Sequence, residues 1–120
     1  MRIEIKGRNV EVTEELAERV EKRFAKVARQ VSELAELEIE LQEERNPSIR
    51  DSQVAEATLH LKGVTLRASD RSESMVHSVN LIADEIARQV KRHRDKRRGP
   101  RHDARAQQQQ QEQPPPAAPV

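Results

Sequence analysis

Apolar residues recur along the first 98 positions at two spacings, one typical of strands and the other typical of helices. Ile3 and Ile5 alternate with polar residues and predict a strand that is buried on one side. Residues 7–9 form a predicted turn, after which Val10 and Val12 resume the alternation. The chain is therefore expected to open with a strand whose pattern is interrupted by one turn.

Two stretches show the three-to-four-residue spacing of an amphipathic helix. The first follows Thr13, a suitable N-cap residue, and its apolar stripe consists of Leu16, Val20, Phe24, Val27 and Val31. The second follows Asp70 and Glu73, which have the spacing of a capping box, and its stripe consists of Met75, Val79, Ile82, Ala83, Ile86 and Val90. We expect each helix to bury this stripe and to expose its polar side.

Three further alternating stretches predict strands. Their inward-facing residues are Leu37, Ile39 and Leu41, then Ala55, Ala57, Leu59 and Leu61, then Val64, Leu66 and Ala68. A tight turn at Lys62 and Gly63 predicts that the last two strands are antiparallel, whereas the helix between the first two strands predicts a parallel pair. The order β-α-β-β-β-α predicts an α+β fold, a four-stranded mixed sheet with two helices packed on one face.

Residues 99–120 lack this patterning. Gly99 and Pro100 mark the change, because proline disfavours a helical conformation in the residue before it. A run of glutamines and three consecutive prolines follow, with scarcely an apolar side chain larger than alanine. We therefore expect one domain over residues 1–98 and a disordered Gln/Pro-rich tail over residues 99–120.

The composition excludes several kinds of chemistry. The 120-residue chain has no cysteine, which rules out disulfides, iron–sulfur clusters, cysteine zinc sites and thiol nucleophiles. Its 3 glycines cannot assemble a P-loop or a dinucleotide fingerprint, and its 4 histidines show no metal-ligand spacing. We expect no enzyme, no cofactor and no metal. No apolar run approaches the length of a membrane span and no signal peptide follows Met1, so we expect a cytoplasmic protein.

The formal net charge of +1 conceals an uneven distribution. Residues 1–84 hold 13 Lys/Arg against 17 Asp/Glu, a net of −4, residues 85–105 hold 9 against 3, a net of +6, and residues 106–120 add only Glu112, a net of −1. The first predicted helix carries the cations Arg19, Lys22, Arg23, Lys26 and Arg29. The second ends in Arg88, Lys91, Arg92, Arg94, Lys96, Arg97 and Arg98. A helix dipole favours a few cations at its C-terminal end but hardly seven, so this pattern predicts a polyanion partner.

Aromatic residues make up 1% of the chain, and the lone Phe24 belongs to an apolar stripe. Modules that read single-stranded RNA by sequence stack its bases on aromatic side chains. The expected contacts are therefore to phosphate and sugar, which position a protein on folded RNA by charge and shape.

Two motifs resemble those of a known family. Residues 5–16 (IKGRNVEVTEEL) and residues 55–63 (AEATLHLKG), followed by Arg67 and a helix entry at residues 70–75, stand at the family's spacing. By these residues and the basic helix end, the chain resembles the ribosome hibernation-promoting factor and protein Y family, also called ribosome-associated translation inhibitors. The resemblance covers residues 1–98 and is to the short form, here with a C-terminal tail.

The resemblance implies a fold similar to a double-stranded-RNA-binding domain and binding in the decoding channel of the small ribosomal subunit. There the protein would block mRNA and tRNA access, inhibit translation and protect idle ribosomes. It also implies ribosomal RNA contacts from Lys22, Arg23, Lys26, Arg29, Arg88, Lys91, Arg92, Lys96 and Arg97. We expect a monomer off the ribosome, with no small-molecule substrate and no membrane partner. Two alternatives remain open from the residues, a general double-stranded-RNA-binding protein and a protein–protein adaptor with a basic helix.

Overall fold

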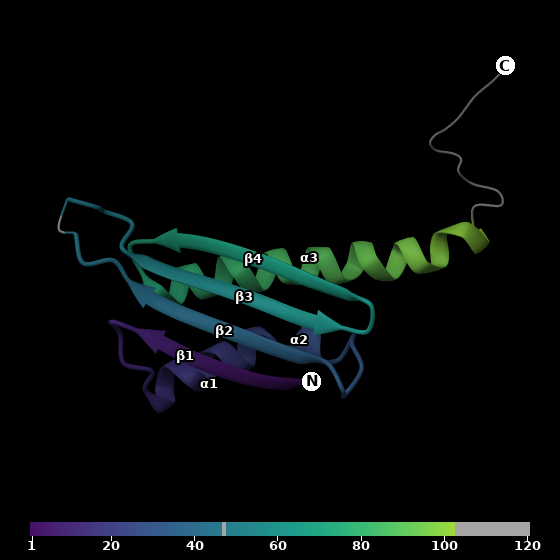
Figure 1. Ribbon diagram of the computed structural model, residues 1–120, viewed down its shortest axis with the longest axis horizontal. Coiled ribbons are helices and arrows are strands. Elements are labelled where there is room, and N and C mark those ends of the chain that lie inside the picture. The colour runs from purple at the N-terminus through teal and green to yellow at the C-terminus, as the bar shows by residue number, and fades with distance from the viewer. Residues whose placement is uncertain (47, 103–120) are drawn as a thin grey trace, which may run out of the picture. The chain divides into compact units, whose positions relative to one another are not determined.

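The computed structural model describes residues 1–46 and 48–102, with side chains described up to residue 96. The elements are β1 (Arg2–Arg8), α1 (Glu14–Arg23), α2 (Ala25–Ala28), β2 (Glu36–Glu43), β3 (Gln53–Leu61), β4 (Val64–Ser72) and α3 (Met75–His102) (Figure 1). Met1–Val90 form one compact unit, and the basic end of α3 from Lys91 belongs to a second. Within the described residues, none of the helices is long and apolar enough to cross a membrane.

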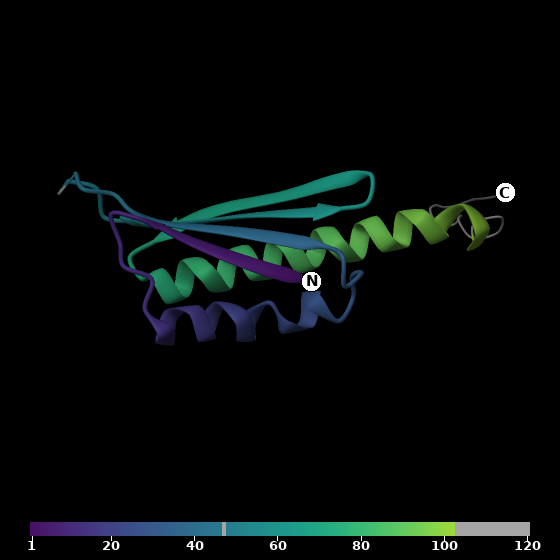
Figure 2. The same cartoon turned by 60° about the horizontal axis from the view of Figure 1, so that its bottom comes forward.

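The four strands form one mixed sheet in the order β1-β2-β3-β4. β1 and β2 are parallel, whereas β2–β3 and β3–β4 are antiparallel, as the sequence predicts for the first and last pairs. One row across the sheet consists of Ile5, Ile39, Ala57 and Ala68, and this row faces the helices. Helices α1 and α2 and the first turns of α3 cover the same face (Figure 2). The predicted α+β fold with its helices on one face is confirmed.

The core lies between that sheet face and the helices. Its largest fully buried side chains include Phe24, Leu37, Ile39, Ile82 and Ile86. All of them come from the predicted apolar stripes, because those positions recur with the period of the element that carries them. The opposite sides of α1 and of the sheet stay exposed to solvent.

The first helical stretch is broken at Phe24 instead of running continuously to Val31. Phe24 takes φ −97° and ψ 4°, which ends α1 and begins the short α2. Its side chain is 0% exposed, and Val27 is 1% exposed in α2. Burial of the stripe thus continues across the break, and Val31 lies beyond α2 and packs only partly against the core.

The predicted capping box at Asp70 and Glu73 is wrong. β4 continues to Ser72, so Asp70 is a strand residue that pairs with Ala55 of β3. The Oγ of Ser74 instead accepts the backbone N–H of His77 at 3.3 Å, in the first turn of α3. Because Asp70 pairs with Ala55 in the β3–β4 ladder, it cannot also be the N-cap residue of α3.

Two further boundaries differ from the sequence expectation. β1 continues to Arg8 and stops at Asn9, whose φ of 60° is left-handed, so Val10 and Val12 pack against the core as loop residues. Helix α3 passes through Pro100 to His102, since the bias that proline places on its preceding residue is a preference, not a barrier. Residues 103–120 of the predicted tail lie outside the described residues, and the domain boundary at 98 stays a prediction.

Candidate nucleic-acid interface

The outward side of α1 and α2 presents a row of cations, which we call the α1–α2 basic face. Its members are Arg19, Lys22, Arg23, Lys26 and Arg29, all exposed. Thr13 starts α1, because its Oγ accepts the backbone N–H of Leu16 at 3.1 Å. The inward side of the same helices holds Val20 and Phe24 in the core, which orients the cations toward solvent.

The cations of this face differ in how far they are already paired. An Nη2 atom of Arg23 lies 2.9 Å from Oδ1 of Asp84, which ties α1 to α3. Within residues 1–46 and 48–96, Lys22, Lys26 and Arg29 form no ion pair. These three therefore carry charge that can meet a phosphate, whereas Arg23 shares its charge with a carboxylate.

Arg88 is the one predicted RNA-contact residue on α3 that belongs to the compact unit ending at Val90. Its side chain is 63% exposed, and its Nη2 lies 2.7 Å from Oε1 of Glu85. The two residues are three apart on the helix, a spacing at which side chains are neighbours on its surface. Sequence reasoning on net charge missed Glu85, although the spacing of Glu85 and Arg88 on a predicted helix is a visible signal.

The rest of the predicted basic end lies in the second unit, on α3 beyond Val90. Lys91, Arg92 and Lys96 are exposed there. The side chain of Arg97 lies outside the described residues. Arg92 and Lys96 are four residues apart and so share one side of the helix.

The outer face of the sheet, opposite the helices, has a different electrostatic character. Its carboxylates are Glu4, Glu36, Glu38, Glu40 and Glu56. Three of them form ion pairs on this face, Glu36 with Arg2 at 3.6 Å, Glu40 with Arg8 at 3.4 Å and Glu38 with His60 at 3.4 Å. The cations of this face include Arg2, Lys6, Arg8 and Arg67, so its charges nearly balance. Because Lys22, Lys26 and Arg29 form no ion pair within the described residues, the helix side is the better candidate for RNA.

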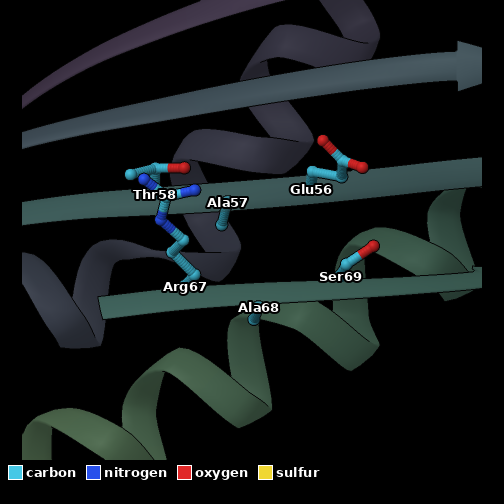
Figure 3. Close-up of a pocket in the computed structure, with 6 residues that line it drawn as sticks. All are labelled: Glu56, Ala57, Thr58, Arg67, Ala68 and Ser69. Carbon is cyan, nitrogen blue, oxygen red and sulfur yellow. The ribbon is translucent and has the colours of Figure 1, made fainter. Parts of the chain in front are cut away.

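A shallow hollow on the same outer face lies over β3 and β4. Figure 3 shows Glu56, Thr58 and Arg67 around it, with the helices behind the strands. The guanidinium of Arg67 lies over Thr58, while Ala57 and Ala68 point to the core side. Small side chains at Thr58 and Ser69 leave the space open. Because the hollow lies beside the carboxylate of Glu56, we do not assign it to phosphate binding.

No group of three or more metal-ligating side chains comes together among the described residues. His60 lies beside Glu38 on the outer sheet face, as the alternation of polar and apolar residues along β3 indicates. His77 is exposed in the first turn of α3.

The fold and the basic helix surfaces together define a small α+β domain suited to binding a polyanion. The chain belongs to the family described as sigma 54 modulation protein / S30EA ribosomal protein, whose model matches residues 3–98. The family predicted from the two sequence motifs is confirmed.

Two relatives show how the match extends along the chain. The ribosome hibernation promoting factor of Salmonella typhimurium is 35% identical over 96 residues, which cover 80% of this chain and 96% of that protein. The ribosome hibernation promotion factor of Picosynechococcus is 32% identical over 100 residues. That alignment covers 82% of this chain and 52% of the relative, so the chain spans about half the length of the Picosynechococcus protein.

Two solved structures share the fold. The crystal structure of the N-terminal domain of Thermus thermophilus protein Y superimposes with a TM-score of 0.66 at 24% identity, covering 78% of this chain and 99% of that domain. A ribosomal subunit interface protein from Coxiella burnetii gives a TM-score of 0.65 at 22% identity, with coverages of 78% and 98%. At these identities the likeness concerns the fold.

Proposed function

We propose that this protein is a ribosome hibernation factor that binds the decoding channel of the small ribosomal subunit. Bound there, it blocks mRNA and tRNA, inhibits translation and protects idle ribosomes in the cytoplasm. The observation that carries the proposal is the α1–α2 basic face, with three exposed cations that form no ion pair within the described residues, in a chain whose relatives are named ribosome hibernation promoting factors. We propose RNA contacts from Lys22, Arg23, Lys26, Arg29, Arg88, Lys91, Arg92, Lys96 and Arg97.

The charge distribution supports an orientation for this binding. Cations on helices release condensed counterions when they meet phosphates, which favours association. The outer sheet face carries five carboxylates beside the cations Arg2, Lys6, Arg8 and Arg67, so it offers these phosphates no excess of positive charge. The helix side would therefore face ribosomal RNA, and the outer sheet face would be turned away from it.

The test is co-sedimentation of the purified protein with small ribosomal subunits at increasing salt. We expect replacement of Lys91, Arg92, Lys96 and Arg97 by glutamine to abolish binding at moderate salt. It should also flatten the dependence of log affinity on log salt by about 0.7–0.9 for each phosphate that the variant no longer neutralises. Failure of the unaltered protein to co-sediment at low salt would refute the proposal.

A matched control removes the same charge from other surfaces. Lys6, Arg45, Lys62 and Arg71 are exposed cations outside both basic helix surfaces. Their joint replacement by glutamine should leave ribosome binding within about twofold, because they make no phosphate contact in the proposed orientation. Equal reductions in binding for both quadruple variants would indicate attraction by net charge alone.

Competition separates the proposed function from general duplex-RNA binding. A ribosome-specific factor should stay on small subunits in the presence of an unrelated RNA duplex. Equal affinity for the duplex and for subunits would favour the general RNA-binding alternative. Retention of a defined protein partner after nuclease treatment would favour an adaptor.

A further inference from the structure

Four residues form a continuous hydrogen-bond chain from the edge of the sheet to the guanidinium of Arg88. The side-chain amide of Gln89 donates to the backbone carbonyl of Arg67 on β4 at 2.8 Å and to Oε2 of Glu85 at 2.9 Å. The other carboxylate oxygen, Oε1 of Glu85, accepts from Nε of Arg88 at 3.1 Å and from its Nη2 at 2.7 Å. All four residues lie within Met1–Val90.

We propose that Glu85 and Gln89 are positioning residues that fix Arg88 for contact with ribosomal RNA. The inference rests on the proposed function and names residues that neither the family match nor net charge identifies. Because Gln89 is anchored to a strand, the carboxylate of Glu85 has a fixed place on the surface of α3. That carboxylate in turn fixes the guanidinium of Arg88.

The fixed guanidinium keeps donors for a second partner. An arginine side chain has five N–H donors, and Glu85 engages one on Nε and one on Nη2. The remaining donors belong to a side chain that is 63% exposed. A phosphate that binds them meets a smaller ordering cost than one that must immobilise a flexible side chain such as Lys22 or Lys26.

Positioning and simple electrostatics predict opposite effects of removing Glu85 on binding to small ribosomal subunits. Glu85 is an anion close to a surface that binds a polyanion, so charge alone predicts that its removal strengthens binding. Positioning predicts that Glu85→Ala weakens binding to small ribosomal subunits, by about two- to tenfold, the range for ordering one flexible side chain. Alanine is the best helix former, so the substitution should preserve α3.

Two variants separate positioning from charge. Gln89→Met removes the anchor without changing net charge and should also weaken binding. Glu18→Ala removes the same charge as Glu85→Ala from an α1 residue that shares a hollow with Lys22 and Arg23. This control should bind as well as the unaltered protein or more tightly.

The deciding measurement repeats these substitutions in an Arg88→Ala background. If Glu85 and Gln89 act through Arg88, Glu85→Ala and Gln89→Met should no longer weaken subunit binding there. Far-UV circular dichroism establishes that each variant is folded. Folded Glu85→Ala and Gln89→Met proteins that bind as tightly as the unaltered protein, or a weakening that persists without Arg88, would overturn the inference. If the unaltered protein does not bind subunits in the same assay, the proposed function itself fails.

Discussion

Phe24 provides the most direct test of the packing. It is the only aromatic residue, is 0% exposed and stands at the break between α1 and α2. Truncation of a buried phenylalanine to alanine costs about 3–5 kcal/mol, because less apolar surface is buried and a cavity is left behind. Domains of this kind are stable by about 5–15 kcal/mol, so Phe24→Ala should remove a large share of the free energy of unfolding.

The melting temperature should fall accordingly. At about 4–8 °C per kcal/mol for a domain of 60–100 residues, Phe24→Ala should lower the Tm by at least about 12 °C. Far-UV circular dichroism, whose ellipticity follows helix content, is the appropriate assay, because the chain has no tryptophan or tyrosine to report by fluorescence.

Leu34 is the matched control, since it is apolar and 86% exposed. Leu34→Ala should change the free energy of unfolding by less than about 0.5 kcal/mol. A destabilisation below about 1 kcal/mol for Phe24→Ala, or equal destabilisation by both variants, would contradict the packing around the α1–α2 break.

Three further substitutions test single features by urea unfolding. Ser78→Ala should lower the free energy of unfolding by about 1–3 kcal/mol, because the fully buried Oγ of Ser78 donates a hydrogen bond to the carbonyl of Gln53 at 2.6 Å. An unchanged free energy of unfolding would mean that this hydrogen bond is dispensable. Gly63→Ala should cost about 1–2 kcal/mol through its φ of 81° alone, since an added Cβ meets nothing within 4 Å. Gly7→Ala should cost more than Gly63→Ala, because its Cβ would collide with the backbone carbonyl of Val10; the reverse order would refute that close approach.

The architecture could be predicted from the sequence because each element carries its own period. The alternation at Leu37, Ile39 and Leu41 predicted a strand, and these residues form the inward face of β2. The tight turn at Gly63 predicted the β3–β4 hairpin, whose ladder starts at Leu61 and Val64.

The local errors have a common physical cause. Capping spacing at Asp70 and Glu73 is a short-range signal, and long-range pairing of β4 with β3 overrode it. The break at Phe24 changes the backbone at one residue, whereas an apolar stripe is a pattern over several helical turns. The stripe therefore does not reveal the break.

The site was predicted less completely than the fold. The sequence predicted which cations the two helices carry, but not which of these cations pair with carboxylates. Arg23 and Asp84 are 61 positions apart and meet only because α1 and α3 pack on one sheet face. The structure thereby distinguishes Lys22, Lys26 and Arg29, which form no ion pair within the described residues, from Arg23 and Arg88, which are held by carboxylates.

The hydrogen bond from Gln89 to β4 has a second consequence, for self-assembly. β4 is an edge strand, and an edge with open backbone groups is a template on which strands of other molecules can add. Gln89 occupies the carbonyl of Arg67, and Oδ1 of Asp70 accepts the N–H of Arg71 at 2.9 Å. These two hydrogen bonds interrupt the row of open groups along β4. Gln89, which we assign to positioning Arg88, therefore also occupies part of the edge on which a strand of another molecule could add.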